Sequence, residues 1–199
     1  MRTSPPLPSA TVLLFVRQTA ISRNSRAFVG IIHWPKHFVL SVLITIREYR
    51  DADIPICAQL YYDTVIHINA RDYTPEQIKA WSPEVWPDSF WRDRFERAHK
   101  VFIAEIDTKI VGFSEYHADG HVDTFYVHHE HQGQGIGKRL MQRIEQEAAR
   151  TGVTKLYLEA SITGRPAFTR MGFAIVGEEV KEYRGAIFRQ ALMEKQLAL

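Results

Sequence analysis

Hydrophobic and polar residues alternate along several short stretches of this chain, and such a period of two is typical of half-buried β-strands. The pattern predicts strands over 44–49, 101–106, 110–116, 121–127 and 155–160, and two closing strands over 173–180 and 186–194. Turn residues separate neighbouring strands, as in Asp107-Thr108-Lys109 and Ala118-Asp119-Gly120. We therefore expect mostly antiparallel pairing in the middle and at the end of the chain.

Segments with a helical period lie between these strands. After the first strand, Asp51 or Asp53 can cap a helix in which Ile56, Leu60 and Val65 point roughly one way. This helix is expected to bury that face against the strands.

The segment Thr74-Pro75-Glu76-Gln77 predicts the start of a second helix. Thr74 is the expected N-cap, Pro75 fits the first helical position, and Gln77 lies three residues after the cap. The helix is expected to end before Pro83. Residues 88–99 could add another turn or two of helix, with three buried aromatic residues, Phe90, Trp91 and Phe95.

A longer helix follows strand 121–127. Its apolar residues recur every four positions, at Ile136, Leu140, Ile144 and Ala148, and Gly152 can end it. A short helix is expected from Pro166 to Gly172. The predicted order is βααβββαβαββ, which describes an α/β protein with a mixed, mostly antiparallel sheet flanked by helices.

A glycine-rich turn, Gln132-Gly133-Gln134-Gly135-Ile136-Gly137-Lys138, joins strand 121–127 to this helix. Such a turn points several free backbone N–H groups at one place, where the helix dipole also favours negative charge. The spacing fits neither the dinucleotide fingerprint nor the P-loop. The turn is therefore interpreted as a phosphate-binding site of another kind.

The pattern Gln132-x-x-Gly135-x-Gly137 resembles the pyrophosphate-binding signature, Arg/Gln-x-x-Gly-x-Gly/Ala, of the GNAT superfamily of acetyl-CoA-dependent N-acetyltransferases. The predicted element order over 44–195 is similar to that of GNAT proteins. The segment 165–173, in which a short helix ends in Gly-Phe, also resembles the family. Ser161 and its neighbours, followed by Pro166 and Phe168, are similar to a branch of small bacterial members.

The resemblance implies acetyl-CoA as co-substrate. The backbone of the strand would bind the pantetheine arm, and the amides of the turn would bind the pyrophosphate, with Lys138 or Arg139 adding charge. The implied cofactor-binding residues are Phe125, Val127, Gln132, Gly133, Gln134, Gly135, Ile136, Gly137 and Lys138.

The resemblance also implies that an amine attacks the thioester directly in a ternary complex. A lysine-type amine with a pKa of about 10.4 is mostly protonated at neutral pH, so a base has to deprotonate it. Odd-numbered residues of strand 121–127 are expected to share one face. Asp123 is the first candidate base, His121 the second, and Glu115 on the adjacent strand the third.

One position departs from the family pattern. Many members carry a tyrosine four residues before the glycine of the Gly-Phe pair, and it protonates the departing thiolate, but here that residue is Phe168. The alternative proton donors are Tyr183 and then Tyr157. A thiol with a pKa of about 8.5 can also leave without a dedicated acid. The departure keeps a second function open, namely a non-catalytic acyl-CoA-binding or sensor module.

The acceptor is expected to be a primary amine of a small molecule or a peptide. In the superfamily its pocket is built by the first two helices and the closing strands, which here carry Tyr61, Tyr62, Trp81 and Tyr183. Ser161 could touch the thioester or cap the next helix. Pairing through the last strands is common among relatives, which leaves a homodimer possible.

Five histidines within a short stretch raise the question of a metal site. They are His117, His121, His128, His129 and His131. No metal is expected, because a turn separates the first two and the other three lie in a loop interpreted as solvated. Cys57 has no assigned acid or histidine partner, so a nucleophilic cysteine is not expected either.

Composition sets the outer limits. The 199 residues are 45% hydrophobic and 24% charged, with a net charge of +2, which favours neither nucleic acid nor an anionic membrane as partner. The single cysteine fits a reducing compartment, so a cytoplasmic location is expected. Residues 1–43 are interpreted as an N-terminal extension, either loosely ordered or the product of a misassigned start, and 44–199 as the acetyltransferase domain.

Overall fold

The computed structural model describes residues 43–198. The prediction of an N-terminal extension over 1–43 concerns residues that lie, except for Leu43, outside this range. Twelve main elements follow in order: β1 (Ile44–Glu48), α1 (Ile54–His67), α2 (Pro75–Trp81), α3 (Asp88–Arg97), β2 (Lys100–Ile106), β3 (Lys109–Tyr116), β4 (Val122–Val127), α4 (Ile136–Arg150), β5 (Lys155–Ala160), α5 (Arg165–Arg170), β6 (Ala174–Tyr183) and β7 (Ala186–Gln196). The predicted order is confirmed, with α3 as a full additional helix.

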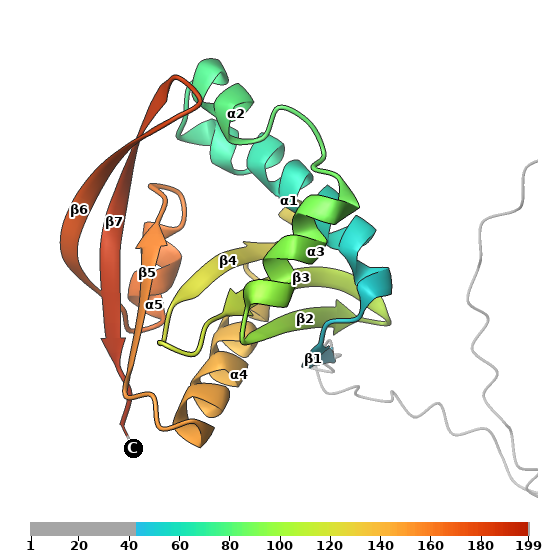
Figure 1. Ribbon diagram of the computed structural model, residues 1–199, viewed down its shortest axis with the longest axis vertical. Coiled ribbons are helices and arrows are strands. Elements are labelled where there is room, and N and C mark those ends of the chain that lie inside the picture. The colour runs from blue at the N-terminus through green and yellow to red at the C-terminus, as the bar shows by residue number, and fades with distance from the viewer. Residues whose placement is uncertain (1–42, 199) are drawn as a thin grey trace, which may run out of the picture. The chain divides into compact units, whose positions relative to one another are not determined.

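The strands form two antiparallel sheets, with orders β1-β2-β3-β4 and β5-β7-β6. A single parallel bridge between His121 and Tyr157 joins them. Figure 1 shows the sheets diverging, with β5, β6 and β7 on the left and β1 to β4 on the right. The predicted fold class is confirmed, and the expected single sheet is divided between β4 and β5.

Helices cover both faces of the first sheet, because neighbouring residues of a strand point to opposite sides. Phe102 and Ala104 of β2 pack with α4, whereas Val101 and Ile103 pack with α1 and α3. The predicted apolar face of α4 is buried from Ile136 to Ala148. This packing fixes the start of α4 beside the end of β4.

The predicted start of α2 is confirmed. The Thr74 hydroxyl accepts the Gln77 N–H at 3.2 Å, and the Gln77 side chain accepts the Thr74 N–H at 2.9 Å. The predicted cap of α1 is wrong in detail, because the side chain of Asp53 instead accepts the Arg50 N–H at 2.7 Å and pairs with Arg47 at 2.6 Å.

Two residues predicted to be buried are exposed. Ile56 is 49% exposed, since α1 buries the face that carries Ile54, Cys57 and Ala58. Phe90 is 38% exposed and stacks on Trp86, with ring centroids 5.1 Å apart.

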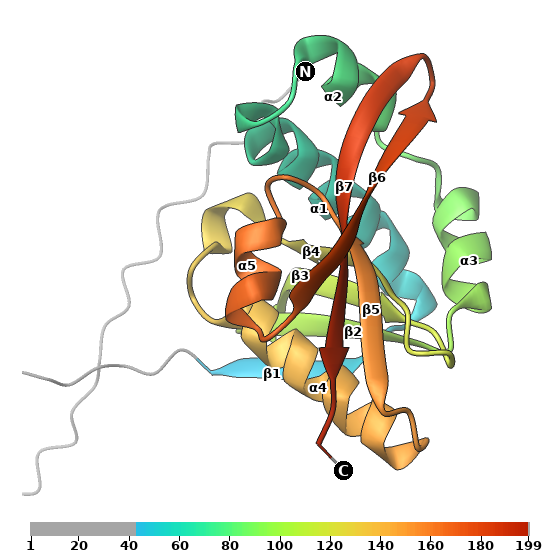
Figure 2. The same cartoon turned by 90° about the vertical axis from the view of Figure 1, so that its left-hand side faces the viewer.

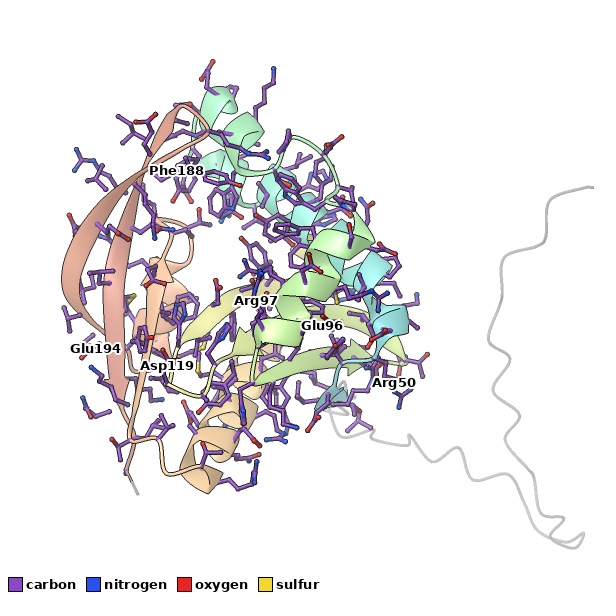
Figure 3. All side chains as sticks on the ribbon, viewed as in Figure 1. Arg50, Glu96, Arg97, Asp119, Phe188 and Glu194 are labelled. Carbon is purple, nitrogen blue, oxygen red and sulfur yellow. The ribbon has the colours of Figure 1, made fainter. Side chains whose placement is uncertain are left out.

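The β6–β7 hairpin extends across to α2 (Figure 2). Phe188 of β7 lies against α2 in Figure 3, and its ring centroid is 5.8 Å from those of Tyr73 and Trp81. The Gln77 side chain also donates to the Ile187 carbonyl at 2.6 Å. These contacts hold α2 against the tip of the β6–β7 hairpin, and together they close one end of the gap between the two sheets.

None of the helices formed by residues 43–198 has the length and apolar character needed to span a bilayer. The predicted cytoplasmic location stays a prediction.

Gly120 allows the two sheets to meet, and replacing it should be costly. It has a φ of +95°, and a Cβ there would lie 2.3 Å from the Lys155 carbonyl oxygen. We expect Gly120→Ala to reduce the free energy of unfolding by more than about 3 kcal/mol. The matched control is Gly152→Ala, where φ is +75° and nothing lies within 4 Å. The control should lose only about 1 kcal/mol in chemical denaturation; equal losses would contradict the prediction.

Glu147 gives α4 a pH-dependent contribution to stability. Its carboxylate is buried, accepts from Arg150 at 2.6 Å and from Arg143 at 3.4 Å, and these bonds lower its pKa to about 2. Because an unfolded glutamate has a pKa of about 4.3, the stabilisation is present above that pH and lost as pH falls toward 2. We therefore expect Glu147→Gln to destabilise the protein at pH 7 but much less at pH 2.5. Urea unfolding at both pH values checks this, and a deficit independent of pH would contradict it.

Candidate active site

A cleft of 750 Å³ runs along the open side of β4, between the two sheets. One end is formed by the glycine-rich turn and the start of α4. The other end is formed by aromatic and charged side chains of α1, α2, α3 and β4. The middle is lined by residues of β4, β5, α5 and the loop that joins the last two, among them Phe125, Leu158, Ser161 and Phe168.

The glycine-rich turn presents free amides to the cleft. Gly133 and Gly135 have φ values of 75° and 85°, and Gly135 is the N-cap of α4. Within residues 43–198, the N–H groups of 132–138 donate to no backbone or side-chain acceptor. The Gln132 side chain holds the turn in place by donating to the Val127 carbonyl at 2.6 Å. The turn therefore has the features of an anion site at a helix N-terminus.

Phe125 and Val127 turn their backbone groups toward the cleft. The His128 N–H donates to the Val111 carbonyl of β3 at 2.9 Å, so alternation along the strand directs the N–H groups of these two residues away from β3. The Val127 carbonyl already accepts from Gln132 and, at 3.2 Å, from Thr64.

The predicted cofactor-binding residues thus lie together, with one exception. The cleft is lined by Phe125, Val127, Gln132, Gly133, Gly135, Ile136, Gly137 and Lys138. Gln134 is exposed and does not line the cleft.

A β-bulge alters the predicted face of β4. Ser114 pairs with Phe125 and Tyr116 with Val122, so β4 has one residue more than β3 over this stretch. Phe125 packs toward α4, whereas Asp123 and Thr124 both contact Arg94 of α3. The prediction that odd-numbered residues share one face is therefore wrong at the bulge.

Arg94 gathers the charged groups at the far end of the cleft. Its guanidinium pairs with Asp123 and donates to Glu115 at 2.8 Å and to the Thr124 hydroxyl at 2.9 Å. The Glu115 side chain is only 1% exposed, and burial raises the pKa of its carboxyl while Arg94 opposes that shift. Asp123 lines the cleft; Glu115 does not.

His121 lies beside Asp123 but contacts the second sheet. Its Nε2 is 2.8 Å from Glu159 of β5, and its ring stacks on Tyr157 with centroids 4.8 Å apart. The hydrogen bond to Glu159 raises the pKa of His121 and lowers that of Glu159. Glu159 lines the cleft, whereas His121 does not.

Aromatic side chains line the end of the cleft near Arg94. They are Tyr61, Trp81, Phe90, Trp91 and Tyr126. Of the predicted acceptor-pocket residues, Tyr61 and Trp81 are therefore in place. Tyr62 and Tyr183 lie outside the cleft lining.

The predicted proton donors are not placed for that role. Tyr183 lies at the tip of the β6–β7 hairpin and is 45% exposed, so its prediction is not supported. The Tyr157 hydroxyl donates to Asp119 at 2.5 Å, which raises the pKa of Tyr157 to about 12. Phe168 lines the cleft and packs on Phe125. The Ser161 hydroxyl accepts the Gly164 N–H at 3.0 Å in the turn before α5, whose N-cap is Gly164 itself.

The argument that a turn separates His117 from His121 is wrong, because the hairpin brings them together. Donor atoms of these two residues and of Asp123 lie within 4.8 Å of one another. However, Glu159 already binds His121 and Arg94 binds Asp123. Asp63, His128 and His129 also converge. The absence of a metal stays a prediction.

Sequence reasoning missed two residues of the site, Arg94 and Glu159. Arg94 belongs to α3 and Glu159 to β5, and no local motif marks either residue. Their partners Asp123 and His121 lie 29 and 38 positions away along the chain. For Glu159 the sequence offers one signal, namely a carboxylate near the end of β5, the strand next to β4.

The fold and this cleft define a class of protein. The chain belongs to the acetyltransferase (GNAT) domain family, whose model matches residues 69–196. Members of this family transfer acyl groups, and the chain is an acyltransferase.

Among similar proteins, YafP of Escherichia coli K12, described as an uncharacterized N-acetyltransferase, is 28% identical over 150 residues, which cover 75% of this chain and 94% of YafP. The L-amino acid N-acyltransferase MnaT of the same organism is 26% identical over 117 residues, covering 55% of this chain and 65% of MnaT. A GCN5-related N-acetyltransferase structure from Rhodopseudomonas palustris superposes with a TM-score of 0.75 and 25% identity, covering 81% of this chain and 99% of that one. The structure of yncA from Salmonella typhimurium with its cofactor acetyl-CoA has a TM-score of 0.61 and 20% identity, covering 78% and 94% of the two chains.

Proposed function

We propose that the protein transfers the acetyl group of acetyl-CoA to a primary amine by direct attack in a ternary complex. The observation that carries this proposal is one continuous cleft with an anion site at one end and carboxylates at the other. The unpaired amides of 132–138 would bind the diphosphate, and the N–H groups of Phe125 and Val127 would bind the pantetheine amides. The thioester then lies where β4 and β5 separate.

Direct attack is favoured over an acyl-enzyme because the described part of the chain offers no placed nucleophile. Cys57, the single cysteine of the sequence, is buried outside the cleft lining, and burial raises the pKa of its thiol. The Ser161 hydroxyl is held in the turn before α5, where it accepts the Gly164 N–H at 3.0 Å. An amine bound beside Asp123 can attack the carbonyl carbon itself.

Asp123 is proposed to receive and orient the ammonium of the acceptor. The aromatic walls around it fit the apolar body of an amine and can contribute cation–π attraction. The acceptor class remains a primary amine of a small molecule or peptide. Because Phe168 has no acidic proton, the thiolate is proposed to take its proton from water.

A thiol-release assay with acetyl-CoA and a panel of alkyl amines, polyamines, aminoglycosides, amino acids and peptides tests the proposal. We expect turnover with at least one primary amine, with one acetylated product per thiol in mass spectrometry. Thiol release without amine measures background hydrolysis. Tight acetyl-CoA binding with no turnover on any amine would contradict the proposal.

A further inference from the structure

His121 and Glu159 form a hydrogen-bonded pair at the place where the two sheets part. The imidazole and the carboxylate are 2.8 Å apart, and their side chains are 23% and 29% exposed. The His121–Tyr157 bridge and the stacking of those rings fix the imidazole against β5. The pair therefore lies between the two sheets, at the side of the cleft and not inside either sheet.

Acetyl transfer to an ammonium group releases a proton. In R–NH₃⁺ + CoA–S–CO–CH₃ → R–NH–CO–CH₃ + CoA–SH + H⁺, the N–C bond forms and the C–S bond breaks with its electron pair on sulfur. The nitrogen loses two protons in all. One balances the thiolate, and the other has to reach solvent from a cleft that the bound co-substrate fills.

The pair connects the cleft to its outer rim. Glu159 lines the cleft, whereas the partly exposed His121 lies outside the lining. The backbone N–H of His121 donates to Asp119, which lies between the two sheets and above α4 in Figure 3. The charged and titratable groups around the pair are Tyr157 of β5, Asp123 of β4, Asp119 of the turn, His117 next to β3, and Lys181 of β6.

The geometry points to the Glu159–His121 pair as the proton outlet of the active site, an inference that rests on the proposed function. Glu159 takes the proton that leaves the amine beside Asp123, and passes it through its hydrogen bond to the imidazole. His121 then releases a proton to solvent at the rim. Glu159 thus acts inside the cleft, and His121 acts through Glu159.

The test compares His121→Ala, His121→Asn and Glu159→Gln with the wild type on two amines that the wild type acetylates. One amine has a pKa near 10.4, and the other has a pKa below the assay pH and arrives neutral. Lys155→Gln is the matched control, because Lys155 lies on the same strand in a solvent-exposed pair with Glu194 at 2.7 Å. Thermal melting and acetyl-CoA affinity show that each variant is folded.

We expect the three variants to lower kcat on the basic amine about 100-fold and on the weakly basic amine less than about 3-fold. The loss should shrink as pH rises toward the pKa of the basic amine, because less proton transfer is then needed. Added imidazole should restore His121→Ala, and Lys155→Gln should match the wild type.

Equal losses on both amines without rescue would assign the pair a structural role and overturn the inference, as would variants with wild-type kinetics. A wild-type protein inactive on every amine would instead overturn the proposed function itself.

Discussion

Gly135→Glu is expected to weaken acetyl-CoA binding at least about 100-fold. A side chain at this position has to adopt a φ of 85°, which costs about 1–2 kcal/mol, and its carboxylate would stand at the N-terminus of α4. That is where the unpaired amides of 132–138 would otherwise receive phosphate. Isothermal titration with acetyl-CoA measures the change.

Gly135→Ala separates the two causes. A Cβ at this position meets nothing within 4 Å, so the alanine variant carries the backbone strain without the charge. It should lose no more than about tenfold in affinity. Unchanged affinity in the glutamate variant would place the diphosphate elsewhere, and equal affinities for the two variants would remove the electrostatic part of the explanation.

Arg94→Met is expected to be the most destabilising substitution in the site. It leaves Glu115, only 1% exposed, without its ion-pair partner, and breaking a buried pair in this way costs about 3–5 kcal/mol. Asp123 loses the same partner but is 41% exposed, so water can replace it. Chemical denaturation at pH 7 measures the loss.

The pH dependence of this loss has a definite sign. In Arg94→Met, the folded-state pKa of Glu115 lies above its unfolded value, because burial then acts without the guanidinium. Stability is complete below the unfolded pKa and falls as pH rises through the folded one. The deficit relative to the wild type should therefore be smaller at pH 5 than at pH 8.

The double variant Arg94→Met/Glu115→Met provides the control. Replacing both partners removes the unpaired buried charge, so most of the lost stability should return. If the double variant is as unstable as the single one, Arg94 acts through packing rather than through its charge.

Local signals in the sequence were enough for the elements and for the glycine-rich turn with its free amides. The capping box at Thr74, the four-residue apolar spacing of α4 and the positions of Gly133 and Gly135 each depend on neighbours a few residues apart. The contacts that such signals specify are made within one or two turns of the chain. They can therefore be predicted without knowing how distant elements pack.

The charged end of the site could not be read in the same way. The contacts of Arg94 with Asp123 and of Glu159 with His121 depend on α3 and β5 being placed beside β4. The prediction that His121 and Asp123 share a face with Phe125 assumed regular alternation along β4. The extra residue of β4 interrupts that alternation. Bulges of this kind depend on pairing with the partner strand, which periodicity does not report.

The divergence of β4 from β5 affects the tendency of the protein to aggregate. A strand edge with free N–H groups ordinarily invites another polypeptide to add to it and so promotes aggregation. Here the N–H groups of Phe125 and Val127 face the second sheet of the same molecule across the cleft, so this edge of β4 is covered instead of open. The divergence of the two strands thus leaves these N–H groups free for a narrow ligand in the cleft without exposing an open strand edge.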